Sequence, residues 1–170
     1  MAKNIKILDK LEQTPGQIKI EKDQPLLKQN IGLLEYALLP LEFWALKTAF
    51  RNKNPMSTGE YYNLSLTQKF TMSKLTLPSS LHGPITADVL RVQESKLREH
   101  KIKFPSYKKV LSTLQSLEAY GLLVSRAEKN KKANAYWYIN PEFLLKYGDA
   151  FNKKYHIDKL EQLVPLPKLQ

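Results

Sequence analysis

The sequence predicts a mainly α-helical fold that carries one small antiparallel β-hairpin. Several segments have apolar residues at helical spacing and begin at a proline or at a residue that caps helices. Further along, turn-prone residues separate two short segments rich in β-branched and aromatic side chains. A chain of 170 residues has the length of one domain with extensions. We expect an N-terminal extension at 1–39, a domain at 40–140 with an insertion near 71–104, and a C-terminal helix and tail at 141–170.

Two short elements are expected within the N-terminal extension. Residues 17–22 alternate apolar and polar side chains, which predicts a brief strand with one apolar face. Residues 25–39 place leucine and isoleucine side chains at the spacing of one helical face.

The domain at 40–140 is predicted to begin with two helices. Proline is favoured at the first helical position, so a mostly buried helix is expected from Pro40 to about Arg51. The turn-prone residues 52–55 end it. Ser57 and Glu60 have the spacing of a capping box, in which each side chain satisfies a free backbone N–H group of the other residue. A second helix should therefore begin here.

A loop and two further helices follow. Proline, serine and glycine residues at 71–84 predict the loop, and an amphipathic helix is expected from 85 to about 100. Pro105 and Ser106 open the next helix, and Gly121 is placed to end it. The apolar face of that helix consists of Tyr107, Val110, Leu111, Leu114 and Leu117.

The segments at 122–127 and 135–139 are the two predicted strands of the hairpin. Between them, residues 128–134 form a turn-prone and basic tip. The C-terminal helix is expected from Asn140 to about Val164, and the prolines that follow should leave the end of the chain as a tail.

Positive charge is concentrated in one part of the chain. The whole sequence has 27 basic and 16 acidic residues, a net charge of +11 and a pI near 9.7. Residues 96–132 contain ten of the basic and three of the acidic residues, so this stretch carries most of the excess. Such a cluster favours a polyanionic partner. The alternative is a lysine-rich surface that serves solubility.

The composition argues against catalysis and against a metal or cofactor site. There are no cysteines, so thiolate nucleophiles, disulfides and cysteine-ligated zinc are excluded. His82, His100 and His156 are isolated in sequence, and the six glycines form no phosphate-binding loop. We expect no enzyme activity, no cofactor and no metal.

No part of the sequence predicts a membrane protein. The first residues do not have the pattern of a secretory signal. The most apolar stretch, 31–50, contains Glu35, Glu42 and Lys47, and each central charge costs roughly 2.5–3.5 kcal/mol on membrane-insertion scales. A cytoplasmic, nucleoid-associated protein is expected.

The predicted order of helix, helix, helix and hairpin resembles the winged helix-turn-helix superfamily. The run PSYKKVLSTLQSLEAYGLLVSR is similar to the recognition helix of that family, and STGEYYNL is similar to the helix before it. The step from the helix to the strand that recurs in the family falls at Leu117, Glu118, Gly121, Leu122 and Leu123. The resemblance covers about 40–140 and leaves open whether the family's second helix begins at Ser57 or near Ile85.

Two branches of the superfamily look most similar. One comprises dimeric regulators of the multiple-antibiotic-resistance and phenolic-acid-repressor types. The other is the C-terminal winged helix of archaeal origin-recognition proteins. The resemblance therefore implies a double-stranded DNA-binding protein, expected to be a transcription regulator. The alternatives are a replication or plasmid-partition factor, or a winged helix that contacts proteins in such an assembly.

The resemblance also implies where DNA would be bound. The helix at 105–120 would enter the major groove, where short polar side chains reach base edges and lysines reach phosphates. Its candidate residues are Ser106, Tyr107, Lys108, Lys109, Ser112, Thr113 and Ser116. The hairpin at 122–139 would be the wing, with Arg126, Lys129, Lys131 and Lys132 near the DNA backbone. Tyr107 could instead be a core residue, and Arg126 could merely flank the sheet.

Two further surfaces have open interpretations. Lys96, Arg98, Lys101 and Lys103 could add phosphate contacts or could form a plain solvated surface. In the C-terminal helix an aromatic stripe is formed by Phe143, Tyr147, Phe151 and Tyr155. Such a stripe either packs on its own domain or forms a homodimer interface, which would place two recognition helices about 34 Å apart on a palindromic site.

Overall fold

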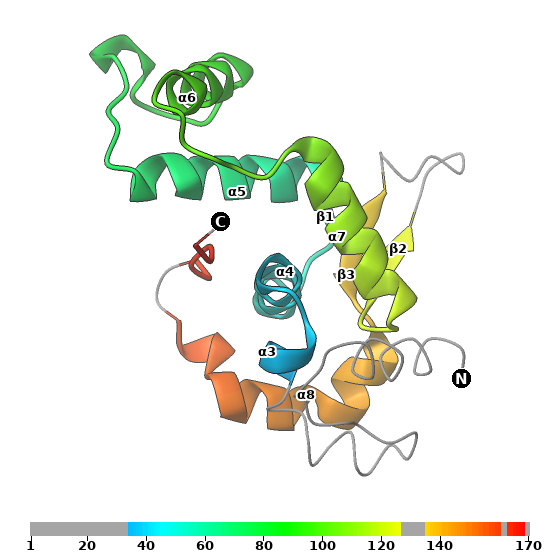
Figure 1. The fold of residues 1–170 in the computed structure, drawn as a ribbon. Coiled ribbons are helices and arrows are strands. Elements are labelled where there is room, and N and C mark those ends of the chain that lie inside the picture. Colours follow the sequence, from blue (N-terminus) through cyan, green and yellow to red (C-terminus); the bar gives the residue numbers. More distant parts are fainter. Residues whose placement is uncertain (1–33, 127–134, 161–162, 169–170) are drawn as a thin grey trace.

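The computed structural model describes residues 34–126, 135–160 and 163–168, and this part of the chain is mainly helical with a small antiparallel sheet. The predicted fold class is confirmed at this level. Helix α4 occupies the centre, α5 lies above it, α8 lies below it, and α7 covers one side together with the sheet (Figure 1). The strand predicted at 17–22 and most of the helix predicted at 25–39 lie outside the described residues.

The short helix α3, Leu34–Ala37, leads into the central helix α4, Pro40–Arg51. The predicted start at Pro40 is confirmed, and the backbone N–H of Leu39 donates to Glu42 Oε1 at 2.9 Å to cap it. Helix α4 is mostly buried because the other elements surround it. Its buried residues are Leu41, Glu42, Trp44, Ala45, Leu46, Thr48 and Ala49.

The two helices α5, Thr58–Met72, and α7, Tyr107–Ala119, pack against each other, and α7 also packs against α4. Between α5 and α4, the rings of Tyr61 and Trp44 lie 6.4 Å apart. The predicted capping box at the start of α5 is present, since Ser57 Oγ accepts from the backbone N–H of Glu60 at 3.1 Å. Gly121 follows α7 with a φ of 83°, a left-handed conformation that favours glycine. Both local predictions are therefore confirmed.

The sheet has three strands in the order β1-β3-β2 and is antiparallel throughout. The predicted hairpin corresponds to β2, Leu123–Arg126, and β3, Tyr136–Ile139. Strand β1, Met56–Ser57, was not predicted. Two residues are too few to show an alternating pattern, and β1 exists because Met56 pairs with Trp137 of the distant β3.

The insertion forms an arm with the far half of α5. After α5 the chain passes through a short 3₁₀ helix, Ser79–Leu81, into α6, Ala87–Glu99. Helix α6 crosses the end of α5 that points away from α4 (Figure 1). Leu66 and Phe70 of α5 and Leu97 of α6 form a small second core, separate from the main one. We call residues 66–104 the arm.

Helix α8, Pro141–Tyr155, begins at the predicted cap, where Asn140 Oδ1 accepts from the backbone N–H of Glu142 at 3.0 Å. It is shorter than predicted. The expectation of a helix to Val164 is wrong, because His156 adopts the left-handed conformation with a φ of 52° and ends the helix. A 3₁₀ turn, Ile157–Lys159, follows.

The aromatic stripe of α8 packs inside its own domain. Phe143, Tyr147 and Phe151 are buried, and Phe151 is fully so. The Phe151 ring lies 5.0 Å from that of Phe50 of α4, and the Tyr155 ring lies 5.0 Å from that of Phe43. Of the two interpretations of the stripe, packing on its own domain is the one that the structure supports, since three of the four residues are buried. A homodimer stays a prediction.

The end of the described chain, 163–168, runs back across the core as a strap. Val164 and Leu166 are buried. The indole N–H of Trp44 donates to the Val164 carbonyl at 3.0 Å, and the backbone N–H of Leu166 donates to Gln68 Oε1 at 2.9 Å. The expectation of a trailing tail is wrong, because alternate apolar side chains of an extended segment can fill a groove between two helices.

Candidate nucleic-acid interface

The predicted recognition helix α7 has one buried and one exposed face. Its buried residues are Val110, Thr113, Leu114 and Leu117, which face α4 and α5. The opposite face is centred on Lys108, Ser112 and Gln115, which are all exposed and are spaced i, i+4 and i+7. We call these three residues the outer stripe of α7.

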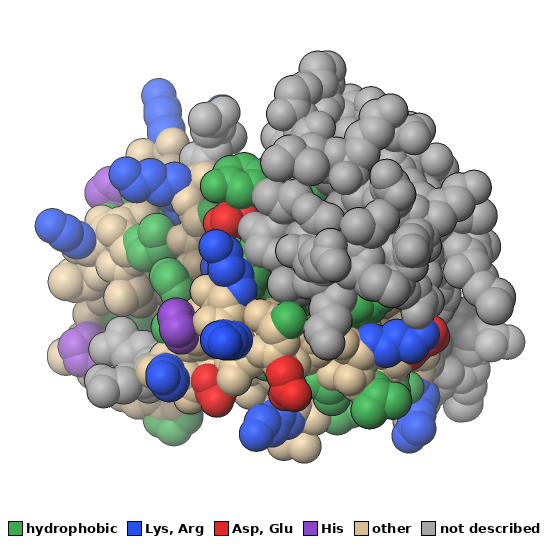
Figure 2. Space-filling model, turned by 90° about the horizontal axis from the view of Figure 1, so that it is seen from below, with side chains coloured by type: hydrophobic (Ala, Val, Ile, Leu, Met, Phe, Trp, Pro, Cys, Tyr) green, Lys and Arg blue, Asp and Glu red, His purple; other side chains and the backbone are tan. Residues whose placement is uncertain are grey.

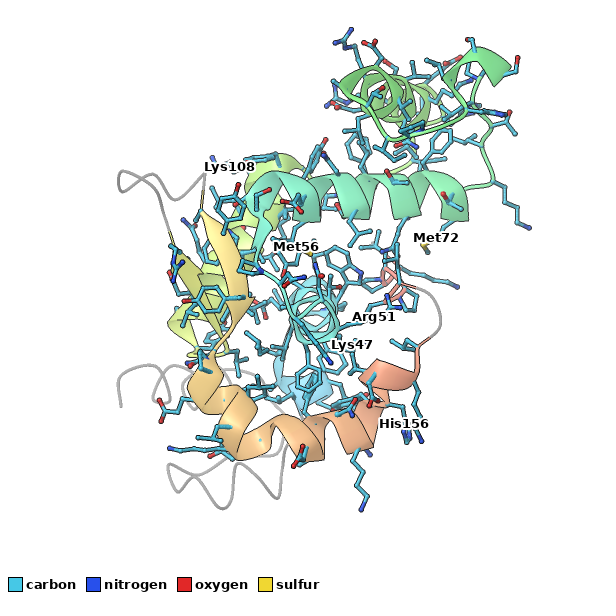
Figure 3. All side chains as sticks on the ribbon, turned by 180° about the vertical axis from the view of Figure 1, so that it is seen from behind. Lys47, Arg51, Met56, Met72, Lys108 and His156 are labelled. Atoms are coloured by element: carbon cyan, nitrogen blue, oxygen red, sulfur yellow. The ribbon has the colours of Figure 1, made fainter. Side chains whose placement is uncertain are left out.

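Most of the residues predicted for this face are accessible. Ser106, Tyr107, Lys108, Lys109 and Ser112 are exposed, and Ser116 is half-buried. Ser106 Oγ accepts from the backbone N–H of Lys109 at 3.0 Å, so it caps the helix while it lies at the surface. In Figure 3, Lys108 lies at the start of α7, whereas His156 lies on the opposite side of the molecule, at the end of α8.

Thr113 is the exception among the predicted residues. It is buried, and its hydroxyl donates to the Lys109 carbonyl within the same helix at 2.8 Å. Helix α7 packs against both α4 and α5, so its buried face is wider than that of a helix with one neighbour and includes Thr113. The prediction that Thr113 faces a partner is therefore wrong.

Tyr107 belongs partly to the packing and partly to the surface. Its side chain is 38% exposed, and its ring meets the edge of the Tyr62 ring with centroids 5.7 Å apart. The interpretation of Tyr107 as a core residue is thus partly correct, and its contact with DNA stays a prediction.

Sequence reasoning did not choose Gln115, although its spacing from Lys108 and Ser112 identifies it. A side-chain amide can donate one hydrogen bond to a base edge and accept another from the same edge. The acidic residue of α7, Glu118, lies near the end of the helix and accepts a hydrogen bond from the Ser125 hydroxyl of β2. This contact joins the hairpin to α7. The first half of α7 contains lysines and neutral side chains and no acidic residue.

The predicted wing residues are described only in part. Arg126 is exposed and ends β2, opposite Tyr136 of β3, which is 43% exposed. Arg126 thus lies at the edge of the hairpin from which the tip continues. Lys129, Lys131 and Lys132 of the tip lie outside the described residues.

Other parts of the surface have a different character. Figure 2 shows the α8 side of the molecule, where lysine and arginine side chains are scattered among acidic and apolar ones. A groove of 1210 Å³ lies between α4, α5 and α8, and its charged lining includes Glu60, Asp149 and Asp158 as well as two basic residues. One of these, Arg51, already donates to the Leu160 carbonyl at 3.0 Å. A polyanion would gain little in this groove.

Within the described ranges, three or more histidine or acidic side chains do not come together in a way that could hold a metal ion. The helices described in this structure also include none that is both long and apolar enough to cross a membrane. Comparison of the chain with protein-family models, curated proteins and solved structures gives no match. The assignment of a function therefore depends on the residues and their geometry.

Proposed function

We propose that the chain is a winged-helix protein that binds double-stranded DNA, with α7 in the major groove and the β2–β3 hairpin as the wing. The order of the elements and the sheet order β1-β3-β2 support this proposal. The position of α5 supports it further. Because α5 follows β1 and packs on α7, α5 corresponds to the second helix of the motif, and α6 is the inserted one.

The outer stripe of α7 is the observation that carries the proposal. Lys108, Ser112 and Gln115 project from a helix whose opposite face is anchored in the core. The major groove of B-DNA is about 12 Å wide and admits an α-helix. Within it, lysine recognises guanine, glutamine recognises adenine, and serine contacts either base.

Phosphate contacts would come from the start of the helix and from the hairpin. The positive end of the α7 dipole lies at Ser106 and favours an anion, and the Lys109 side chain adds a full charge there. Further positive charge in the wing would come from Arg126 at the end of β2 and from the three lysines of the hairpin tip. Such contacts fix the orientation of a protein on DNA without reading its sequence.

We favour a transcription regulator in the cytoplasm, associated with the nucleoid. A replication or plasmid-partition factor would bind through the same helix and hairpin, and the genomic fragments that the protein selects would distinguish the two. A homodimer on a palindromic site stays a prediction, and its interface would need residues other than the buried stripe of α8. The proposal involves no catalytic step and no cofactor.

The test compares duplex binding by the wild type and two double variants at two salt concentrations. Lys108→Ala with Gln115→Ala removes the ends of the outer stripe, and Lys153→Ala with Lys154→Ala removes two exposed lysines of α8, on the far side of α4. We expect the wild type to select particular genomic fragments, the stripe variant to lose that selectivity, and the α8 variant to behave as the wild type. Absence of duplex binding at about 50 mM salt would overturn the proposal.

A third variant, Lys131→Ala with Lys132→Ala, distinguishes base recognition from binding of the phosphate backbone. Loss of two wing lysines should weaken binding to all fragments to a similar degree, because phosphate contacts are independent of sequence. If this variant alone lost selectivity while the stripe variant kept it, α7 would not be the reading element.

A further inference from the structure

The segment that joins α6 to α7 carries lysines on the outside of the molecule. From Lys101 to Phe104 the residues alternate, with Lys101 and Lys103 exposed and Ile102 and Phe104 half-buried against the second core. Lys101 lies in the turn that ends α6, with a left-handed φ of 57°, and the backbone N–H of Ile102 donates to the Leu97 carbonyl at 2.9 Å. The apolar residues therefore hold the segment on the arm while both lysines face the solvent.

The two arginines of the arm form ion pairs within it. Arg98 pairs with Glu94 at 2.6 Å and lies over the Phe104 ring at 5.7 Å, and Arg91 pairs with Asp88 at 3.5 Å. Within the described ranges, Lys101 and Lys103 have no such ion pair, a property they share with the other lysines of the arm. What distinguishes them is their place in the segment that leads into α7. Their charge is thus available to an external anion.

The arm is fixed relative to α7 through a shared residue. The Tyr62 hydroxyl donates to Glu94 Oε2 of α6 at 3.4 Å, and the Tyr62 ring contacts Tyr107 of α7. Helix α5 carries Tyr62 and packs on both α6 and α7. In Figure 1 the joining segment passes in front of α5 and leads directly into α7. The position of this segment relative to the outer stripe of α7 is therefore fixed.

We propose that Lys101 and Lys103 form a second phosphate-contacting element, which lengthens the DNA site on the side of α7 away from the wing. This inference rests on the proposed function. Residues 101–107 span less than the roughly 20 Å of a fully extended chain, because Lys101 lies in a turn. One DNA strand has a phosphate every 3.4 Å along the axis, so this length corresponds to up to about six base pairs. The added contacts lie on one side of α7, so the site of a single chain is asymmetric.

The test measures affinity for a duplex of about two helical turns as a function of salt. The slope of log K against log salt is negative, and removal of two phosphate contacts should decrease its magnitude by about 1.8. Lys101→Ala with Lys103→Ala should show this decrease, and the charge reversal Lys101→Glu with Lys103→Glu should weaken binding further. Lys153→Ala with Lys154→Ala is the matched control, because it removes the same charge from the α8 side. All four residues are exposed, and thermal unfolding verifies that each variant is folded.

Local cleavage identifies the contacted side. Since the chain has no cysteine, Lys103→Cys and Ser112→Cys each create a single attachment point for an iron chelate that cleaves nearby DNA. On a selected fragment, cleavage from position 103 should be displaced to one side of cleavage from position 112 by up to about six base pairs.

The outcomes separate the two proposals. If the wild type binds duplex DNA but the arm variants match the α8 control in slope, the arm does not contact DNA and the inference is overturned, while the proposed function stands. If the wild type binds no duplex, the proposed function and the inference both fail. A slope of smaller magnitude with displaced cleavage supports both.

Discussion

The indole N–H of Trp137 in β3 donates to the hydroxyl of Thr58 at the start of α5, across 2.9 Å, and both side chains are fully buried. The two residues are 79 positions apart in sequence. Their hydrogen bond joins the second strand of the hairpin to the helix that packs on α7. It therefore fixes the hairpin relative to the proposed recognition helix.

Thr58→Val should destabilise the protein by about 1–3 kcal/mol, because it leaves the buried Trp137 N–H without an acceptor. Thr48→Val is the matched control. The buried Thr48 hydroxyl donates to the Trp44 carbonyl of its own helix, so its loss leaves no donor unpaired. Urea unfolding of both variants provides the comparison. Equal stability losses would show that the Trp137 hydrogen bond is not what matters at Thr58.

Ser106 allows the stability of α7 to be separated from DNA binding. Ser106→Ala should cost about 1 kcal/mol of stability through loss of the cap, whereas Ser106→Asp should retain the cap and interact favourably with the helix dipole. The aspartate nevertheless places a negative charge where a phosphate is expected. We predict that Ser106→Asp is as stable as the wild type and binds duplex DNA more weakly. Unchanged affinity would place the phosphates elsewhere.

The strap should contribute to stability through single buried residues. Leu166 is buried, while Leu163 in the same segment is 53% exposed. Leu166→Ala should lower the free energy of unfolding by about 2–5 kcal/mol, and Leu163→Ala should change it by less than about 0.5 kcal/mol. Chemical unfolding measures both values. Two equally mild effects would mean that the strap is not packed on the core in solution.

Tyr61 should make the protein sensitive to alkaline pH. Burial, and secondly the Glu60 carboxylate, raise the pKa of the Tyr61 phenol above its ordinary value of 10.0. Above pH 10 the unfolded chain releases this proton while the folded chain retains it, so stability falls with rising pH. The slope from one such group is at most about 1.4 kcal/mol per pH unit. Unfolding of Tyr61→Phe between pH 10 and pH 11 should show a slope that is shallower by up to this amount, and an identical slope would contradict the raised pKa.

The starts of the helices could be predicted from the sequence because capping is local. Four helix starts are each set by one residue at or next to the first turn of that helix: Pro40, Ser57, Ser106 and Asn140. The end of α7 was predictable for the same reason, since Gly121 follows it directly. The hairpin was also predictable, since the properties of its strands and turn lie within one short stretch.

The remaining features depend on partners that are distant in sequence. Thr113 is buried because α5 and α4 both approach α7, and Met56 is a strand residue because Trp137 lies beside it. Val164 is held by Trp44, 120 positions away. None of these contacts leaves a local pattern. The aromatic residues of α8 are buried in the same way by distant partners, since Phe43 and Phe50 of α4 pack on Phe151. Their spacing alone left open whether they were core residues.

The central claim is that the outer stripe of α7 contacts DNA, and amide spectra during titration with a selected duplex test it most directly. We predict that the signals of Lys108, Ser112, Gln115 and Arg126 shift on addition of DNA, while those of Lys153 and Lys154 on α8 stay in place. Shifts confined to α8 or to the groove beside it, with α7 unaffected, would contradict the account.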